Sequence, residues 1–407
     1  MQKKSNDHRY VIKAIPIETG NSVELARPMQ THPLSYQELD LDPEYTNYAD
    51  GRFTLEKLSN ASPDEMYWKV RQEIILRHTG EHPYEISGPD AEKLLQKIFT
   101  RDISKVNIGR CSYQFACYHD GGMISDGLLI KFNKNKFWFA QGDGHLFSWY
   151  KAHAIGLDVE IQDPSVWVSQ IQGPKSIELL KKILDQPLKN NFNYFDWEEV
   201  SIASENVIIS RTGFTNELGW EIYLRPENNA KKIGDLILET GKEMGMILTA
   251  SPGFRGRRIE AGLLSASRDF TKDRTPFSVG LGKFIDFNKG DFIGRDYLIN
   301  ADKSCLTWGL RVENSFAVVD SDILYNNKKI GLITSSTWSP YQVCGVSIVH
   351  MSSKIYGPGT IVDVLCDDAK IHKGEICELP MYDSKREIVR GINKKIPLNP
   401  KPWGGIR

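Results

Sequence analysis

The sequence lacks several features that would place it in a large class of proteins. No apolar run approaches the roughly 20 residues that a membrane-spanning helix needs. Its 51 basic and 52 acidic residues nearly cancel, so we expect no broad electrostatic attraction to nucleic acid or to an anionic membrane. The first residues, MQKKSNDHRYVIKAIP, are charged and lack the apolar core of a secretory signal peptide. These absences favour a globular protein without nucleic-acid or membrane partners.

Cysteine is scarce and shows no pattern. The six cysteines have no C-x-x-C spacing and form no dense framework, which favours free thiols and a reducing, cytoplasmic location. Nine histidines are scattered along the chain. His78 and His82 are four residues apart, but Thr79 and Gly80 between them argue against a metal-binding helix. We therefore expect no metal site.

The 407 residues are enough for two or three domains. Residues 1–60 are polar and irregular, which predicts an extended arm packed on the body. Within residues 61–298, the segments 84–99 and 169–184 repeat one pattern of a strand, a Gly-Pro turn and an amphipathic helix, with strands following each. This repetition predicts an α+β body of two pseudo-symmetric halves with a ligand cavity between them. Gly-Pro helix starts are common, so a coincidental similarity is the alternative.

The chain changes character near residue 299. Residues 228–245 still have the spacing of an amphipathic helix, whereas residues 299–384 contain only short strands separated by polar or glycine-bearing turns. We expect a small antiparallel β-barrel there. Residues 385–407 carry seven basic residues and one acid. For this basic tail, a solvated segment is favoured over an anion-binding one.

Three residues stand out from their surroundings. In RTGFTNELGWEIYL, residues 211–224, Glu221 is the one acid in a strand of large apolar residues. Pattern alone favours a solvent-facing position for it over a ligand-binding one, because period-2 alternation suffices. Asp126 in GGMISDG has the pattern of a turn residue. Tyr113 in CSYQFACY is as well explained by a place in the core.

These motifs resemble those of the glycine-cleavage T-protein family, which are folate-dependent one-carbon transferases. Residues 213–222 resemble the family's G-Y-T-G-E-x-G-x-E-I segment, and residues 121–126 its G-G-x-I-x-D motif. Residues 258–263 fit the family's R-L-E-x-G-L pattern, and residues 275–277 fit the start of its T-P-x-E-x-G-L pattern. The resemblance covers about residues 65–385, and within it the chain is most similar to the dimethylsulfoniopropionate demethylase branch.

The resemblance implies a tetrahydrofolate cavity between the two halves and assigns roles to particular residues. Asp126 falls on the family's catalytic aspartate. Glu221 falls on the carboxylate that binds the pterin edge with paired hydrogen bonds, and Tyr113 on an aromatic residue near the folate. Arg255, Arg257 and Arg258 are the candidates for binding the anionic tail, with Arg255 and Arg258 preferred. Two carboxylates in an apolar cavity need such a partner, because burying an unpaired charge is costly.

Several positions depart from the family pattern. Phe214 replaces a tyrosine in the glycine-bearing loop, which keeps a ring near the folate and loses a hydroxyl donor. Ser125 replaces a common acid, and Phe254 an arginine that T-proteins place before R-L-E. Residues 77–79, Arg-His-Thr, replace the family's D-x-S, and Glu81 falls on a methionine that touches folate in T-proteins. These changes argue against glycine cleavage and favour a demethylase.

We therefore expect a tetrahydrofolate-dependent methyltransferase that acts as a demethylase. It would move a methyl group from a small sulfonium, ammonium or methoxy compound to tetrahydrofolate, with a dimethylsulfoniopropionate-like donor favoured. Three alternatives remain. They are an aminomethyltransferase working with a lipoyl carrier protein, an aryl O-demethylase, and a non-catalytic folate-binding regulatory protein.

Overall fold

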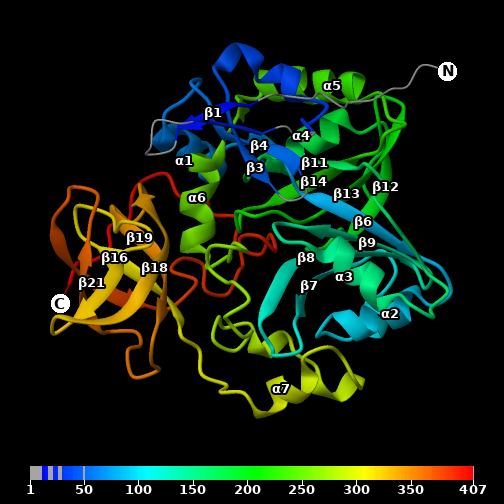
Figure 1. The fold of residues 1–407 in the computed structure, drawn as a ribbon. Coiled ribbons are helices and arrows are strands. Elements are labelled where there is room, and N and C mark those ends of the chain that lie inside the picture. Colours follow the sequence, from blue (N-terminus) through cyan, green and yellow to red (C-terminus); the bar gives the residue numbers. More distant parts are fainter. Residues whose placement is uncertain (1–11, 17–21, 26–29, 49–50, 407) are drawn as a thin grey trace.

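Two sheets and a closed β-barrel carry the fold of this computed structural model, which describes residues 12–16, 22–25, 30–48 and 51–406. Figure 1 shows the barrel on one side, the two-sheet body on the other, and the helix α6 (Ser251–Glu260) between them. The predicted α+β class, with a two-part body and a C-terminal antiparallel barrel, is confirmed. Among the described residues, no helix combines the length and apolarity needed to cross a membrane.

The first half of the body is an antiparallel sheet in the order β10-β6-β9-β8-β7. Two helices cover one of its faces, α2 (Ala91–Ile98) and α3 (Leu146–His153), and their apolar side chains join those of β6 and β9 in one core cluster. The strands are β6 (His82–Ser87), β7 (Cys111–Cys117), β8 (Met123–Asn133), β9 (Lys136–Gln141) and β10 (Glu160–Gln162).

The second half is a sheet in the order β12-β13-β14-β11-β5-β15, antiparallel except where β15 pairs with β5. Helices α4 (Ser176–Ile183) and α5 (Ala230–Glu243) pack their apolar faces on it, as the amphipathic patterns predicted. The strands are β5 (Ile75–Thr79), β11 (Trp167–Gln172), β12 (Trp197–Ile202), β13 (Glu205–Ser210), β14 (Gly219–Leu224) and β15 (Ile247–Leu248).

The predicted repeat has the same local structure in both copies. Strand β6 and helix α2 correspond to β11 and α4, and every bound is displaced by 85 residues. Gly88 and Gly173 connect strand to helix with φ of 126° and 121°, a region that favours glycine. One feature was not predicted: β5 precedes the first copy in the chain but pairs with β11 of the second. The two halves are therefore linked by exchange of a strand.

The barrel and the outer segments complete the described chain. Six strands close the barrel in the order β16-β19-β18-β17-β20-β21, and α7 (Arg295–Asn300) precedes them. The predicted arm, residues 1–60, lies partly outside the described residues; its described part forms two hairpins, β1–β2 and β3–β4. The barrel strands are β16 (Thr307–Val312), β17 (Asp322–Tyr325), β18 (Lys328–Ser339), β19 (Cys344–Met351), β20 (Ile361–Leu365) and β21 (Ile371–Cys377). The hairpin strands are β1 (Ile12–Pro16), β2 (Ser22–Leu25), β3 (Glu44–Tyr48) and β4 (Arg52–Lys57).

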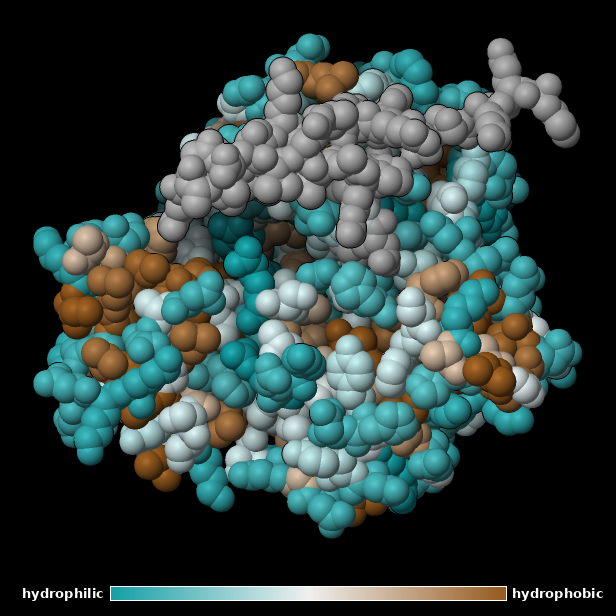
Figure 2. Space-filling model, in the orientation of Figure 1, coloured by the Kyte–Doolittle hydropathy of each residue, from teal (hydrophilic) through white to brown (hydrophobic). Residues whose placement is uncertain are grey.

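Figure 2 shows a face of mixed polarity, with hydrophobic side chains gathered over the barrel at left.

The C-terminal segment corrects one expectation. The basic tail is not simply solvated, because Ile388 and Val389 are buried against the body. Its backbone also returns to the barrel side, where Lys401 N donates to the carbonyl of Tyr341 at 2.8 Å. The apolar residues within the basic run explain this packing, and the charge count alone concealed it.

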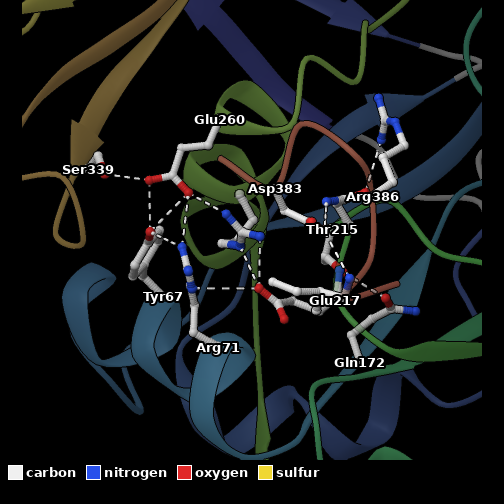
Figure 3. A network of polar contacts seen from close by, with 12 residues as sticks. Tyr67, Arg71, Gln172, Thr215, Glu217, Glu260, Ser339, Asp383 and Arg386 are labelled. Carbon is white, nitrogen blue, oxygen red and sulfur yellow. Dashed lines mark hydrogen bonds and ion pairs between the residues drawn. The ribbon is translucent and has the colours of Figure 1, made fainter. Parts of the chain in front are cut away.

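A buried ion network joins helix α1 (Pro63–Gln72), helix α6 and the loop before β14 (Figure 3). Arg257 binds Glu217 at 2.8 Å and also binds Glu260. Arg71 of α1 contacts the same two acids, at 3.6 Å and 3.4 Å. Their side chains are at most 3% exposed. Two cations and two anions balance here, which matters because an unmatched buried charge is costly.

The same network reaches the barrel. Glu260 accepts from Tyr67 at 2.8 Å and from Ser339 at the end of β18. Burial alone would raise the pKa of Glu260, but Arg257 and Arg71 hold that pKa below its usual range. Glu260 is therefore ionised at neutral pH and ties body and barrel together through α6.

We predict that Glu217→Gln destabilises the protein strongly, because it leaves two buried guanidinium groups facing one carboxylate. Breaking a buried pair in this way lowers the free energy of unfolding by about 3–5 kcal/mol. The measurement is urea unfolding at pH 7. Glu56→Gln is the matched control, because Glu56 pairs with Arg255 at 2.7 Å where both side chains are partly exposed, and its effect should be much smaller. Equal shifts in the two variants would contradict the structural role given to the network.

Candidate functional site

Strand alternation turns Asp126 and Glu221 toward the space between the two sheets. In β14, Glu221 has the parity of Tyr223, which belongs to an apolar cluster shared by both sheets. In β8, Asp126 has the parity of Ile130 in the same cluster. Ser125 has the opposite parity, is fully buried, and donates to the carbonyl of Asp143 at 2.6 Å. The serine that replaces a family acid therefore fixes a loop and does not face the inter-sheet space.

A cavity of about 870 Å³ lies where the two sheets, the segment that follows α6 and the start of the barrel strand β16 meet. That volume is within the range of small-molecule and cofactor sites. Four of the six residues predicted from the sequence line it: Tyr113, Asp126, Phe214 and Glu221. The structure thus brings together residues that are up to 108 positions apart in the chain.

Asp126 and Tyr113 act as a pair in this cavity. The Tyr113 hydroxyl donates to Oδ2 of Asp126 at 2.6 Å, from the neighbouring strand β7. Burial raises the pKa of Asp126 to about 6, and the hydrogen bond from Tyr113 opposes that rise. Asp126 is therefore mostly ionised at pH 7 and close enough to its pKa to exchange a proton.

Glu221 is held firmly by protein donors. Its Oε2 accepts from Thr212 at 2.6 Å, from Tyr223 at 2.9 Å and more weakly from Ser210 at 3.4 Å. Its Oε1 accepts from Gln170 Nε2 at 3.1 Å. Burial raises the pKa of Glu221, and the bonds from Thr212, Tyr223 and Ser210 oppose the rise. A carboxylate has about four acceptor positions, so Glu221 has little capacity left for a ligand.

The glycine-bearing loop before β14 depends on Gln172, the last residue of β11. Gln172 Nε2 donates to the carbonyl of Thr212 at 3.2 Å, and its Oε1 accepts from Thr215 at 2.8 Å. A Cβ on Gly213 or Gly219 would come within 2.2 Å of the Gln172 amide. The two glycines are needed because the loop closes over this side chain, and the loop in turn places Phe214 at the cavity.

The two arginines predicted to bind an anionic tail do not line the cavity. Arg258 is 7% exposed and binds Asp269 at 2.7 Å and Ser335 Oγ at 2.7 Å, which fastens α6 to the barrel. Arg255 lies on the outer side of α6 and pairs with Glu56. This placement gives no support to the tail-binding role. The R-x-E motif on α6 instead supplies the ion pairs that hold the fold.

Sequence reasoning missed several cavity residues. Tyr48 comes from the hairpin β3–β4, and Lys385 and Arg386 come from the basic tail. Arg386 is positioned by its bonds to Asn216 Oδ1 at 3.0 Å and to the carbonyl of Ala261 at 3.1 Å. Glu81 was noted only as a departure from the family, yet it also lines the cavity. For Lys385 and Arg386, the sequence signal was the high number of basic residues in the tail, seven in residues 385–407.

Three departures from the family meet in one corner. Phe254 is buried with Val70 and Ile75, and Phe214 packs against that cluster. The Arg77 guanidinium lies over the Phe254 ring at 4.7 Å. The family's arginine on α6 is thus replaced by Phe254, but Arg77 on β5 still places a guanidinium group in this corner.

A second hollow, of about 1010 Å³, lies between α4 and the C-terminal segment. It is lined by basic side chains such as Lys181 and Lys394, and by none of the six residues predicted from the sequence. It is the larger of the two by volume. We assign the functional site to the smaller cavity, because the carboxyl groups of Glu81, Asp126 and Glu221 line it together.

Comparison with known proteins identifies the family. Residues 31–289 match the family model that is described as the GCVT N-terminal domain. The chain is 34% identical to an aminomethyltransferase of Caldanaerobacter subterraneus subsp. tengcongensis over 299 residues, which is 71% of this chain and 79% of that protein. It is 32% identical to a trimethylamine-oxide aldolase of Ruegeria pomeroyi, over 75% of this chain and 41% of that protein.

A solved structure shares the fold. The crystal structure of the glycine cleavage system aminomethyltransferase T from Bartonella henselae superposes with a TM-score of 0.78 at 20% identity, over 88% of this chain and 99% of that one. Together with the sequence matches, this confirms the superfamily to which the motifs pointed. The chain belongs to the GCVT family and is an enzyme of the folate-dependent one-carbon transferase class.

Proposed function

We propose that this protein is a tetrahydrofolate-dependent demethylase, which moves a methyl group from a small methylated compound to N5 of tetrahydrofolate. A dimethylsulfoniopropionate-like sulfonium is the favoured donor. The observation that carries the proposal is the cavity itself, where Asp126, Tyr113, Phe214 and Glu221 meet. One relative is named for trimethylamine oxide, a small methylated compound, which supports a donor of this kind.

The cavity residues fit a reduced folate. A pterin presents N–H donors on its pyrimidine edge, and the corner around Glu221 offers carboxylate acceptors. Buried Oε1 of Gln170 also has no hydrogen-bond partner among the described residues, so this corner is rich in acceptors. The rings of Tyr113 and Phe284, whose centroids are 5.6 Å apart, offer aromatic surface on which the pterin ring can pack. The cations that line the cavity suit the carboxylates of the glutamate tail: Arg101, Arg110, Lys283, Lys385 and Arg386.

Tetrahydrofolate, when bound, supplies the nucleophilic nitrogen N5 that takes the methyl group. The donor's S–CH₃ bond breaks as the N–CH₃ bond forms, and the electron pair leaves with sulfur as a neutral thioether. Asp126, with a pKa of about 6, accepts the proton that N5 loses. Its charge also attracts the cationic donor before transfer. The remaining contribution of the cavity walls is to align donor and acceptor away from water.

A second candidate is aminomethyl transfer, because curated relatives at 30–34% identity are named aminomethyltransferases. The two activities differ in product and in partner. We expect incubation with tetrahydrofolate and dimethylsulfoniopropionate to give 5-methyltetrahydrofolate, measured by chromatography, without any carrier protein. Trimethylamine N-oxide, dimethylglycine and a methoxybenzoate complete the donor panel. Formation of methylenetetrahydrofolate alone, and only with a lipoyl carrier protein, would assign the protein to aminomethyl transfer.

The two predicted carboxylates should separate in their effects. Because Asp126 acts on the transferred group, Asp126→Asn should lower kcat at least a hundredfold, in the range of general acid–base contributions, while folate affinity changes little. Glu221→Gln should weaken tetrahydrofolate binding roughly tenfold, because a charged acceptor is lost. Calorimetry measures the affinities, and thermal unfolding checks that both variants fold. Unchanged kinetics and affinity in both folded variants would refute their placement in the site.

The pH dependence follows from Asp126. Its ionised form is the active one, so kcat/KM should fall as the pH drops below about 6. Tyr113→Phe removes a donor that favours ionisation, so the acid limb should move to higher pH. Tyr194→Phe is the control, since it makes the same change at a cavity tyrosine with no hydrogen bond to Asp126 among the described residues. An identical limb in Tyr113→Phe and in the wild type would contradict the assignment.

A further inference from the structure

Two carboxylates, one buried and one partly buried, share one amide group at the end of the cavity. Gln170 Nε2 donates to Glu221 Oε1 at 3.1 Å and to Glu81 Oε1 at 3.0 Å. Both hydrogens of this amide are therefore used, and they hold the two acids side by side. Glu81 lies just before β6, whereas Glu221 is in β14 of the other sheet. The pair thus bridges the two halves of the body.

The two acids differ in what they have left for a ligand. Glu221 already accepts from Gln170, Thr212, Tyr223 and Ser210. Glu81 accepts only from Gln170 among the described residues, so its Oε2 has no protein donor. Glu81 also lines the cavity. It is therefore the member of the pair with an oxygen available to a bound molecule.

A pterin edge needs more than Glu221 can supply. Its pyrimidine ring presents three groups in a row: the acceptor N1, an amino group with two N–H donors, and the donor N3–H. Glu221 uses about all of its four acceptor positions, and only the one that accepts from Ser210, at 3.4 Å, is weakly used and open to a ligand. A buried polar group left without a partner is costly. The edge therefore requires a second protein group beside Glu221, and Glu81 is placed to be that group.

We propose that Glu81 binds the pyrimidine edge of a reduced folate together with Glu221, accepting from the 2-amino group and donating to N1. This inference rests on the proposed function and deepens it. A carboxyl group can do both only when it carries a proton, since an ionised carboxylate is an acceptor alone. The pair would then hold one proton and one negative charge, which matches an edge of donors with a single acceptor.

The surroundings of Glu81 favour that proton. Burial raises the pKa of Glu81 well above its usual range, and the charge of Glu221 raises it further. Arg77 from β5 opposes this rise, as does the hydrogen bond from Gln170. Tyr48 from β3 also faces the group, and burial raises the pKa of this tyrosine, so it adds no charge. Of the two acids, Glu81 is therefore the one whose neutral form is favoured by its neighbours.

The test compares Glu81→Gln and Glu81→Met by calorimetry with 5-formyltetrahydrofolate between pH 6 and 9. A glutamine amide supplies the same acceptor and donor as a neutral carboxyl group, so Glu81→Gln should bind within about threefold of the wild type at pH 6. Above the pKa of Glu81, wild-type affinity should fall by up to roughly tenfold per pH unit. Glu81→Gln should lack that fall. Glu81→Met should lose roughly tenfold or more at every pH.

Glu378→Gln is the matched control, because it makes the same change in an acid that lines the cavity from beyond β21. It should keep the wild-type pH profile. Wild-type affinity in Glu81→Met, or a Glu81→Gln profile that still falls with pH like the wild type, overturns the inference. If Glu81→Met does not fold, the Glu81→Gln profile decides alone. No binding by the wild type would instead refute the proposed function.

A modified ligand distinguishes contact from a general change in the cavity. A reduced folate with CH in place of N1 cannot accept the proposed hydrogen bond. It should bind the wild type roughly tenfold more weakly than the parent compound, and the two should bind Glu81→Met equally. An equal loss in both proteins would show that N1 does not meet Glu81. A Glu81 variant that changes only the donor's KM would contradict the inference as well.

Discussion

The buried balance of two arginines and two glutamates is the constraint on which the site depends. Arg257 and Arg71 lie against Glu217 and Glu260, and none of the four side chains has appreciable contact with water. Each acid anchors a different part: Glu217 belongs to the loop that carries Phe214, and Glu260 binds the barrel through Ser339. The family's glycine-bearing and R-x-E motifs are thus joined by charge. These ion pairs hold the Phe214 loop and the barrel, which form walls of the cavity, in fixed positions.

The cavity is in turn shaped by acids that the fold has made costly to ionise. Asp126 lies near the midpoint of its titration at pH 6, while Glu81 and Glu221 share a corner that favours one charge for two carboxyl groups. A ligand that brings N–H donors relieves this corner, and a cationic donor relieves Asp126. The basic side chains lie elsewhere on the lining, where Arg386 is fixed by the backbone of α6's C-terminal end. This arrangement of charge suits the proposed folate, whose pterin edge carries N–H donors and whose glutamate tail is acidic.

The sequence predicted the architecture well because periodicity and glycine-proline punctuation are local signals. The repeat, the α5 helix and the six barrel strands all follow from them. Family motifs placed Asp126 and Glu221 correctly within one cavity. They did not separate structural from cavity arginines, since the tertiary partners that distinguish Arg258 from Arg386 cannot be read from the motifs. The proposed role of Glu81 also required the structure, because the pairing of β5, β11 and β14 brings it to Glu221.

The most direct test of this account is a crystal structure of the protein with 5-methyltetrahydrofolate. The account predicts the pterin in the 870 Å³ cavity, its pyrimidine edge within hydrogen-bond distance of Glu81 and Glu221, and N5 beside Asp126. The glutamate tail should point toward Arg386. A folate bound in the basic hollow beside α4, or one in the cavity with its tail toward Glu221, would contradict it.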